Sequence, residues 1–229
     1  MLGIFDSGRG GQNVLAVLRG LAPFADIAYF ADTLGAPYGT KSREELFVRI
    51  LHDEAILRRA GCERILIGCC TASTLYDMLP KNTRARLFPI VEETSKEAAK
   101  VTKNGKIAVL CTEASCRADT FGICIQKYSP DADVITVPSQ AYVGLAEADR
   151  INEGDEAFER QLRFTLEILK KHNADTAILG CTHFHPLGIH LKRHMPSLRV
   201  VSSAEVGARA FLGTASYHEL SGGGVTVYL

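Results

Sequence analysis

Two cysteines in matching apolar contexts are the residues of this sequence best suited to chemistry. Cys69 lies within ILIGCCTAS (65–73) and Cys181 within AILGCTHF (177–184). A thiol can serve as base or acid, because its ordinary pKa of about 8.5 is lowered by a nearby cation or helix N-terminus. Two thiols that face one carbon from opposite sides could invert a stereocentre, since one removes a proton and the other delivers one.

Polar residues next to these cysteines suggest how a substrate would be held. Thr71 and Thr182 follow a cysteine or cysteine pair where a strand gives way to a helix. Their hydroxyls, with local backbone amides, could bind a substrate carboxylate. His183 lies two residues beyond Cys181, where an imidazole could tune the thiol or pass protons.

The alternative interpretation treats cysteine as a small buried hydrophobe, because cysteine is among the most buried residue types. For Cys69 and Cys181, spacing and symmetry alone leave both interpretations open. We prefer the packing interpretation for Cys62, Cys111, Cys116 and Cys124.

Short apolar runs alternate with amphipathic stretches along the chain, which predicts an α/β fold with mainly parallel sheets flanked by helices. Several runs are apolar nearly throughout, as in strands that are covered on both faces. The predicted strands are 2–5, 26–31, 64–69, 88–91, 106–111, 133–138, 176–181, 199–202 and 225–229.

Several helices have recognisable starts or faces. Three segments carry the capping-box pattern, in which a hydroxyl and a carboxylate satisfy free amides at a helix start. They are Ser42 with Glu45, Thr94 with Glu97 and Ser202 with Glu205. The clearest amphipathic helix is predicted over 153–173, with a stripe of Phe158, Leu162, Thr165, Leu166 and Leu169.

A weak internal sequence repeat divides the chain into two lobes of similar design. The two cysteine segments repeat after a little over one hundred residues, as do LGIFDSG (2–8) and IAVLCTEAS (107–115). We predict one lobe from 1–94 plus 205–229 and a second from 95–204, related by pseudo-twofold symmetry. Ligands of parallel sheets bind beyond the carboxyl ends of the strands. The active site is therefore expected between the lobes.

The composition of the chain limits the kinds of partner and the cell compartment that are expected for the protein. The chain has 229 residues, with 26 Lys+Arg against 26 Asp+Glu, which argues against nucleic-acid binding by a broad basic surface. No apolar run approaches the ~18 residues of a membrane helix, and the start shows no signal peptide. Seven cysteines, an odd number, indicate free thiols in a reducing cytoplasm.

Two motifs that could bind a cofactor or metal are weak. Gly8, Gly10 and Gly11 fail the G-x-G-x-x-G fingerprint at Asn13, and they favour a tight strand-to-helix turn with close approach of a small substrate to backbone amides instead. A C-x-H-x-H run ends at His185, but the usual spacing of structural zinc sites is absent. We expect neither a cofactor nor a metal.

Four segments together resemble the glutamate racemase family, within the aspartate/glutamate racemase superfamily. They are FDSGRGG (5–11), ADTLGAPYGTKS (31–42), GCCTAS (68–73) and LGCTHF (179–184), in family order and spacing. The resemblance implies a cofactor-independent amino-acid racemase that makes D-glutamate from L-glutamate for peptidoglycan synthesis.

The resemblance also implies roles for individual residues. Cys69 and Cys181 would be the two bases, and Asp6 would assist the first of them. Glu147 falls near the place of an acid that works with the histidine. The implied substrate-binding residues are Asp6, Ser7, Tyr38, Gly39, Cys70, Thr71, Ser115, Thr182 and His183.

One departure from the family pattern leaves the substrate open. Cys70 stands where the family has asparagine, and a thiol is a weaker hydrogen-bonding group than an amide. The alternatives are a racemase or isomerase of another carboxylated substrate such as aspartate, or a non-catalytic amino-acid-binding or regulatory protein. The sequence leaves the oligomeric state open, a homodimer included.

Overall fold

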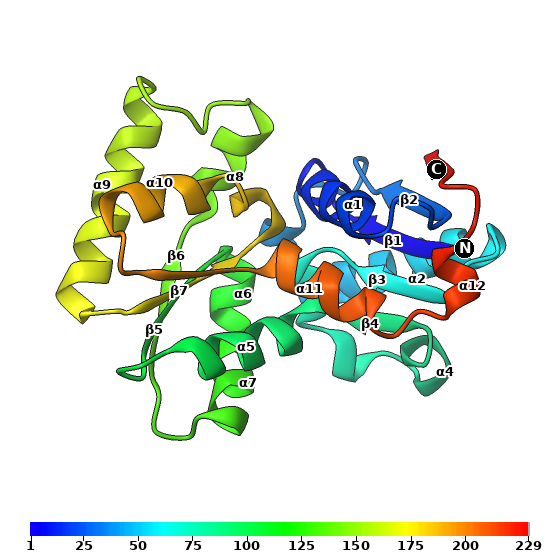
Figure 1. The fold of residues 1–229 in the computed structure, drawn as a ribbon, viewed down its shortest axis with the longest axis horizontal. Coiled ribbons are helices and arrows are strands. Elements are labelled where there is room, and N and C mark those ends of the chain that lie inside the picture. Colours follow the sequence, from blue (N-terminus) through cyan, green and yellow to red (C-terminus); the bar gives the residue numbers. More distant parts are fainter. Residues whose placement is uncertain (229) are drawn as a thin grey trace.

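The computed structural model describes residues 1–228, which form two parallel sheets that lie next to each other (Figure 1). The first has the order β4-β3-β1-β2-β9 and the second β6-β5-β7-β8, and every strand pairing is parallel. The α/β prediction is therefore confirmed. The strands are β1 (Leu2–Asp6), β2 (Ile27–Ala31), β3 (Arg64–Ile67), β4 (Leu87–Pro89), β5 (Lys106–Cys111), β6 (Asp133–Pro138), β7 (Thr176–Gly180), β8 (Arg199–Ser202) and β9 (Thr226–Tyr228).

The internal sequence repeat corresponds to a repeated strand order. The first sheet runs β2-β1-β3-β4 and the second runs β6-β5-β7-β8, so β1 matches β5 and β3 matches β7. The two cysteine segments follow β3 and β7, which are equivalent strands. We call the two sheets with their helices the first and second lobes. The residues at which one lobe ends and the other begins stay a prediction.

Helices cover the sheets and join the lobes. They are α1 (Gly10–Leu21), η1 (Tyr38–Thr40), α2 (Arg43–Arg59), α3 (Cys70–Ser73), η2 (Tyr76–Met78), α4 (Lys81–Arg84), α5 (Ile90–Val101), α6 (Glu113–Ala118), α7 (Thr120–Tyr128), α8 (Gln140–Glu147), α9 (Glu156–His172), η3 (Thr182–Phe184), α10 (Leu187–His194), α11 (Ser203–Leu212) and α12 (Tyr217–Leu220). A single buried cluster includes Ile4 of β1, Ile178 of β7 and Phe211 of α11. The lobes therefore share one hydrophobic core at their junction.

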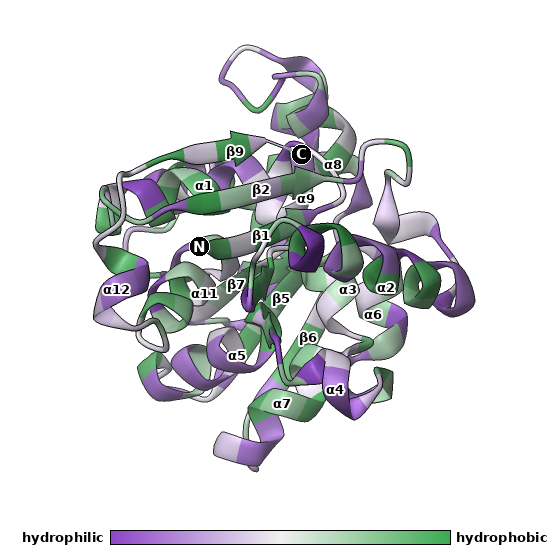
Figure 2. Ribbon diagram, turned by 90° about the vertical axis from the view of Figure 1, so that its right-hand side faces the viewer, coloured by the Kyte–Doolittle hydropathy of each residue, from purple (hydrophilic) through white to green (hydrophobic). Residues whose placement is uncertain are grey.

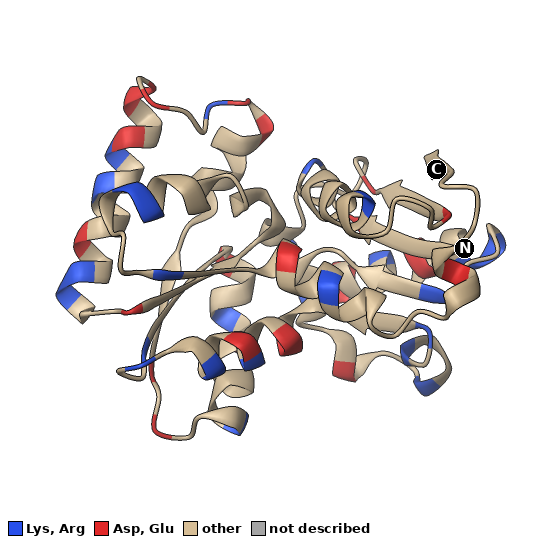
Figure 3. Cartoon of the chain, viewed as in Figure 1, with Lys and Arg blue, Asp and Glu red and all other residues tan. Residues whose placement is uncertain are grey.

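The distribution of residue types follows these layers. Hydrophobic residues gather in the strands at the centre of the molecule, and hydrophilic ones lie on outer helices such as α4 (Figure 2). Charges of both signs are interspersed along the outer helices α5 and α9, while the central strands carry few (Figure 3). No helix within residues 1–228 has the length and apolar character needed to cross a lipid bilayer.

Two of the three predicted helix starts form caps. The Ser42 hydroxyl accepts a hydrogen bond from the Glu45 amide at 3.2 Å, and the Glu45 carboxylate accepts one from the Ser42 amide at 3.0 Å. This is a complete capping box. Ser202 accepts from the Glu205 amide at 3.4 Å, which is only half of the pattern.

The prediction for the segment around Thr94 is wrong. β4 ends at Pro89 and α5 begins at Ile90, so the predicted strand 88–91 runs into the helix. Thr94 lies inside α5, where its hydroxyl donates to the Ile90 carbonyl at 2.6 Å. A short apolar run fits a strand and a buried helix equally well, which explains the error.

The amphipathic helix is confirmed, with a later start than predicted. α9 begins at Glu156 because the Asp155 carboxylate accepts a hydrogen bond from the Phe158 amide at 3.0 Å and caps the helix there. All five residues of the predicted stripe are buried. The final strand is β9, and Leu229, which the prediction also included, lies outside the described residues.

The close packing of α11 on α5 leads to a stability prediction. A Cβ on Gly207 of α11 would meet the Ile90 Cβ at 2.7 Å, so Gly207→Ala should lower the free energy of unfolding by about 1–3 kcal/mol. A Cβ on the exposed Gly20 of α1 would meet nothing within 4 Å, so Gly20→Ala should raise it by up to about 1 kcal/mol. Urea unfolding of both variants measures the difference. Equal effects would contradict this packing.

Candidate active site

A cavity of about 530 Å³ lies where strands of both lobes end, and both Cys69 and Cys181 line it. Each cysteine follows a central strand of its own sheet, β3 for Cys69 and β7 for Cys181. The lining residues are Ser7, Gly8, Arg9, Thr33, Ala36, Pro37, Tyr38, Gly39, Cys69, Thr71, Thr112, Gln140, Val143, Gly144, Glu147, Cys181 and His183. The cavity thus brings together two thiols from equivalent positions of two like lobes.

The thiol of Cys69 is held at the start of a one-turn helix. Burial raises its pKa to about 12, and the negative charge of Asp6 adds to the increase. The backbone amides of Thr71 and Ala72, in α3, act in the opposite direction because they donate to the sulfur. Cys69 is therefore a thiol in the resting site, next to donors that stabilise a thiolate once it forms.

A buried carboxylate lies behind this thiol. Asp6, the last residue of β1, is completely buried and accepts a hydrogen bond from the Thr182 hydroxyl at 2.8 Å. The Ser7 hydroxyl donates to its other oxygen at 3.3 Å. Burial raises the pKa of Asp6 to about 6, although the hydrogen bonds and nearby His183 oppose the increase. Asp6 can consequently exchange a proton close to neutral pH.

The thiol of Cys181 faces an imidazole. Its sulfur lies 3.5 Å from Nδ1 of His183. Burial raises the pKa of Cys181 well above its ordinary value, while the backbone amide of His183 opposes this by donating to the sulfur. The groups that act on the two thiols thus differ: the charge of Asp6 acts on Cys69, and the imidazole of His183 lies next to Cys181.

Glu147 orients that imidazole. Oε1 of Glu147, at the end of α8, lies 2.5 Å from Nε2 of His183. The Gly10 amide points at the same nitrogen at 3.2 Å and would donate to it in the other tautomer, but the 2.5 Å contact with a carboxylate is shorter and stronger. We therefore assign the proton to Nε2, shared with Glu147. This tautomer leaves Nδ1 free to accept the proton of Cys181.

The glycines after β1 allow this close packing. A Cβ on Gly10 would lie 2.6 Å from Nδ1 of His183 and would also overlap the Thr182 hydroxyl. One on Gly8 would lie 2.9 Å from the carboxylate of Glu147. Gly8 and Gly10 thus allow side chains of the second lobe to lie against the turn after β1. The expected approach of a substrate to the backbone amides of these glycines stays a prediction.

Sequence reasoning missed an ion pair at the cavity edge. The Arg9 guanidinium donates to both oxygens of Asp149, each at 2.8 Å, and to the Glu147 carbonyl at 3.0 Å. It thereby joins the turn after β1 to the end of α8. Arg9 stands in the FDSGRGG motif, but nothing in the sequence indicates a partner 140 positions away.

Tyr38 and Gly39 line the cavity from η1, and their contact with a substrate stays a prediction. The Tyr38 hydroxyl lies 2.8 Å from Asp32 and 2.6 Å from Asp53. It has one proton to donate, so a second proton is needed between these three oxygens. Burial raises the pKa of Asp53 to about 6, so its carboxyl takes up this second proton as the pH falls through 6.

Four of the predicted site residues lie behind the cavity instead of lining it. Asp6 and Thr182 are hydrogen-bonded to each other, as described above. The Cys70 thiol donates to the Ser203 hydroxyl of α11 at 3.2 Å, and Ser115 accepts from Thr112 at 3.0 Å. Thr71, which does line the cavity, lies 3.0 Å from the Thr112 hydroxyl. The catalytic and binding roles of all these residues stay predictions.

The side chains of the C-x-H-x-H run do not face one common point. Nδ1 of His185 lies 2.9 Å from the Ser202 hydroxyl, whereas His183 faces Cys181 and Glu147. Within residues 1–228, no group of three or more His, Cys, Asp or Glu side chains is placed to hold a metal ion.

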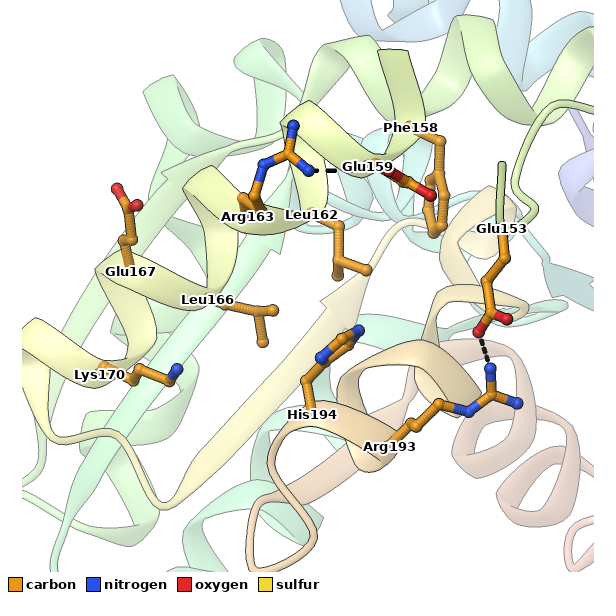
Figure 4. Close-up of a pocket in the computed structure, with 10 residues that line it drawn as sticks. All are labelled: Glu153, Phe158, Glu159, Leu162, Arg163, Leu166, Glu167, Lys170, Arg193 and His194. Atoms are coloured by element: carbon orange, nitrogen blue, oxygen red, sulfur yellow. Dashed lines mark ion pairs between the residues drawn. The ribbon is translucent and has the colours of Figure 1, made fainter. Parts of the chain in front are cut away.

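A second cavity, of about 650 Å³, has a different character (Figure 4). It lies between α9 and α10, where Glu153 pairs with Arg193 and Glu159 lies 3.7 Å from Arg163. The described residues that line it include no cysteine. The paired thiols therefore distinguish the cavity between the lobes as the candidate active site.

Two like α/β lobes that each present a thiol to one cavity define a racemase-type α/β protein. The chain belongs to the Asp/Glu/hydantoin racemase family, whose model matches residues 17–211. A glutamate racemase from Geobacter metallireducens is 33% identical over 214 residues, which cover 91% of this chain and 77% of that protein. The resemblance seen in the sequence is confirmed.

Solved structures agree with this assignment. A glutamate racemase from Bacillus anthracis superimposes with a TM-score of 0.87 at 24% identity, covering 100% of this chain and 86% of that one, which shows the shared fold. A glutamate racemase from Thermus thermophilus, in complex with beta-chloro-D-alanine, gives a TM-score of 0.82 at 27% identity. That match covers 99% of this chain and 86% of the other.

The buried Asp53 predicts a pH dependence of stability. Its pKa is about 6 in the folded protein against an ordinary value of 3.8, so its contribution to stability is present below pH 4 and lost as pH rises through 6. At about 1.4 kcal/mol per pKa unit, the loss is on the order of 3 kcal/mol. Asp53→Asn should remove this part of the decline, as measured by urea unfolding between pH 4 and 7, and the part due to Asp6, whose pKa is also about 6, should remain.

The matched control for this variant is Glu44→Gln, because Glu44 is an exposed carboxylate on the same helix. That variant should keep the pH dependence of the parent protein. An Asp53→Asn variant with an unchanged decline would show that Asp53 is not the carboxyl that titrates near pH 6.

Proposed function

We propose that the protein interconverts L- and D-glutamate by a two-thiol mechanism without a cofactor, and that it supplies D-glutamate for peptidoglycan synthesis. The observation that carries this proposal is the presence of Cys69 and Cys181 on one cavity, each after an equivalent strand of its lobe. The 33% identity to a glutamate racemase supports glutamate as the substrate. Seven free cysteines favour a reducing, cytoplasmic location.

The reaction moves two protons and leaves the substrate's atoms otherwise unchanged. The thiolate on one face takes the hydrogen of the α-carbon as a proton, and the electron pair stays on the substrate as a carbanion. The thiol on the other face then gives its proton to that carbon. The two sulfurs exchange protonation states in each turnover, so the reverse reaction starts from the opposite thiolate.

Each thiolate needs a group that accepts the thiol proton, because burial raises the pKa of both cysteines. For Cys181, that acceptor is Nδ1 of His183, with Glu147 stabilising the imidazolium that results. For Cys69, it is Asp6, whose pKa of about 6 lies close to the working range. The backbone amides at α3 and η3 then stabilise the sulfur charge.

The position of Cys70 bears on the choice of substrate. Its thiol is turned toward Ser203 of α11, and it does not line the described cavity. The replacement of asparagine at this position therefore gives no reason in itself to prefer aspartate. Activity on aspartate, and binding of an amino acid without activity, are the alternative outcomes of the hydrogen-exchange experiment.

Hydrogen exchange tests the proposal directly. The protein is incubated with L-glutamate, or with L-aspartate, in deuterium oxide without an added cofactor. With L-glutamate, circular dichroism should disappear while deuterium enters the α-position. Cys69→Ser and Cys181→Ser should each abolish racemisation, because a serine hydroxyl is a far weaker acid than a thiol. Exchange of one enantiomer should survive in each variant, since one thiol remains.

The control is Cys124→Ser, because Cys124 lies in α7 and does not line the cavity. This variant should racemise as the parent does. Full activity in either Cys69→Ser or Cys181→Ser would refute the two-thiol mechanism. Thermal stabilisation by L-glutamate without deuterium uptake would instead identify a binding protein.

Glu147→Gln should weaken the reaction without removing the cavity. The variant keeps the shape of the side chain but loses the charge that stabilises a protonated His183. Because a hydrogen bond to a charged group contributes about 1.5–3 kcal/mol, kcat/KM should fall roughly ten- to hundredfold. Steady-state kinetics with both enantiomers measure the effect. A Glu44→Gln variant should keep the parent value, and an equal loss there would contradict a specific role.

A further inference from the structure

A pair of thiols outside the cavity is left unexplained by the proposed reaction. Cys111 ends β5 and Cys116 lies in α6, and their sulfurs are 2.7 Å apart. Neither residue lines the cavity between the lobes. The packing interpretation accounts for the burial of Cys111 but not for a second sulfur placed directly against it. We propose that Cys111 and Cys116 form a redox modification site, which a hydroperoxide converts into an intramolecular disulfide.

The backbone holds the two sulfurs together. Thr112 caps α6 by accepting a hydrogen bond from the Ser115 amide, and the Cys116 amide donates to the Thr112 carbonyl at 2.9 Å. These contacts fix the turn between β5 and α6. A disulfide has a sulfur–sulfur distance of about 2.05 Å, so the bond requires an approach of only about 0.7 Å.

The two thiols differ in the way that a stepwise oxidation requires. Cys111 is completely buried, and its pKa is raised by the hydrogen bond to Cys116 and by burial. Cys116 is only partly buried, and its pKa is lowered by the hydrogen bond from Cys111. Cys116 is therefore the sulfur that reacts first, with Cys111 as its partner.

The chemistry balances with one hydroperoxide per disulfide. The Cys116 thiolate attacks the terminal oxygen of the hydroperoxide, the O–O bond breaks, and an alcohol leaves after protonation, or water when the oxidant is hydrogen peroxide. Cys116 is then a sulfenic acid. The Cys111 sulfur attacks it, the new S–S bond forms and water leaves. Two thiols lose two electrons in total, and the peroxide gains them.

The cavity cysteines are poorer targets for the same oxidant. Burial raises the pKa of both Cys69 and Cys181, whereas the pKa of Cys116 is lowered. Since the thiolate is the form that reacts with peroxides, Cys116 should react first. The modification also bears on the cavity, because Thr112 lies within the ring that the disulfide closes and lines the cavity wall.

Peptide mapping tests the proposal. The full-length protein is treated with a small excess of hydrogen peroxide, its free thiols are blocked with N-ethylmaleimide, and trypsin is added. One tryptic peptide, residues 107–117, contains both cysteines. In the oxidised sample this peptide should be unlabelled and two hydrogens lighter than its reduced form. Dithiothreitol should restore double labelling. Residues 65–81 and 172–192, which contain the cavity cysteines, should stay labelled.

Single variants separate the two thiols. Cys111→Ser should stop at a sulfenic acid on Cys116, which dimedone traps, because the second sulfur is missing. Cys116→Ser should leave Cys111 fully labelled. Cys62→Ser is the matched control, because Cys62 is buried without a sulfur partner at hydrogen-bond distance among the described residues, and it should keep the disulfide.

Two results would overturn the proposal. In the first, peptide 107–117 stays doubly labelled while the cavity peptides lose their label. In the second, the disulfide found joins two chains. Circular dichroism of each variant verifies that the fold is retained, so a missing disulfide in a folded parent protein is a clear negative result.

Discussion

The hydrogen bond between Asp6 and Thr182 is the contact on which the site most depends. Asp6 is completely buried in the first lobe, and the hydroxyl of Thr182 comes from the second. A buried carboxylate without partners is costly, so the donors must stay in place for the carboxylate to remain charged. The same group raises the pKa of Cys69. A single residue therefore links the position of the lobes to the proton affinity of one thiol.

Strand positions were predictable where an apolar run is bounded by turn residues. β5, β6 and β8 have the predicted bounds. The internal sequence repeat also agrees with the strand order that the two lobes share. The start of α5 was not predictable in the same way. Its first residues continue the apolar run of β4, and periodicity cannot divide such a run between strand and helix.

Much of the candidate site was predictable because its reactive residues follow two strands that resemble each other. Cys69, Cys181 and His183 line one cavity. The orientation of Cys70 and the pairing of Arg9 with Asp149 could not be foreseen. They depend on how one lobe packs against the other, over separations of more than one hundred residues, and local sequence carries no signal for such contacts.

The lobes repeat each other in strand order but differ in chemistry. Cys69 has a carboxylate behind it, and Cys181 has an imidazole held by Glu147. A carboxylate becomes neutral when it accepts a proton, whereas a neutral imidazole becomes a cation. Protonation therefore changes the local charge differently next to the two thiols. The thiolate of Cys181 would lie beside a positive charge and that of Cys69 beside a neutral acid. In the proposed reaction the two thiolates exchange roles, so this asymmetry, and not the repeated fold, would determine which of the two thiolates is favoured at rest.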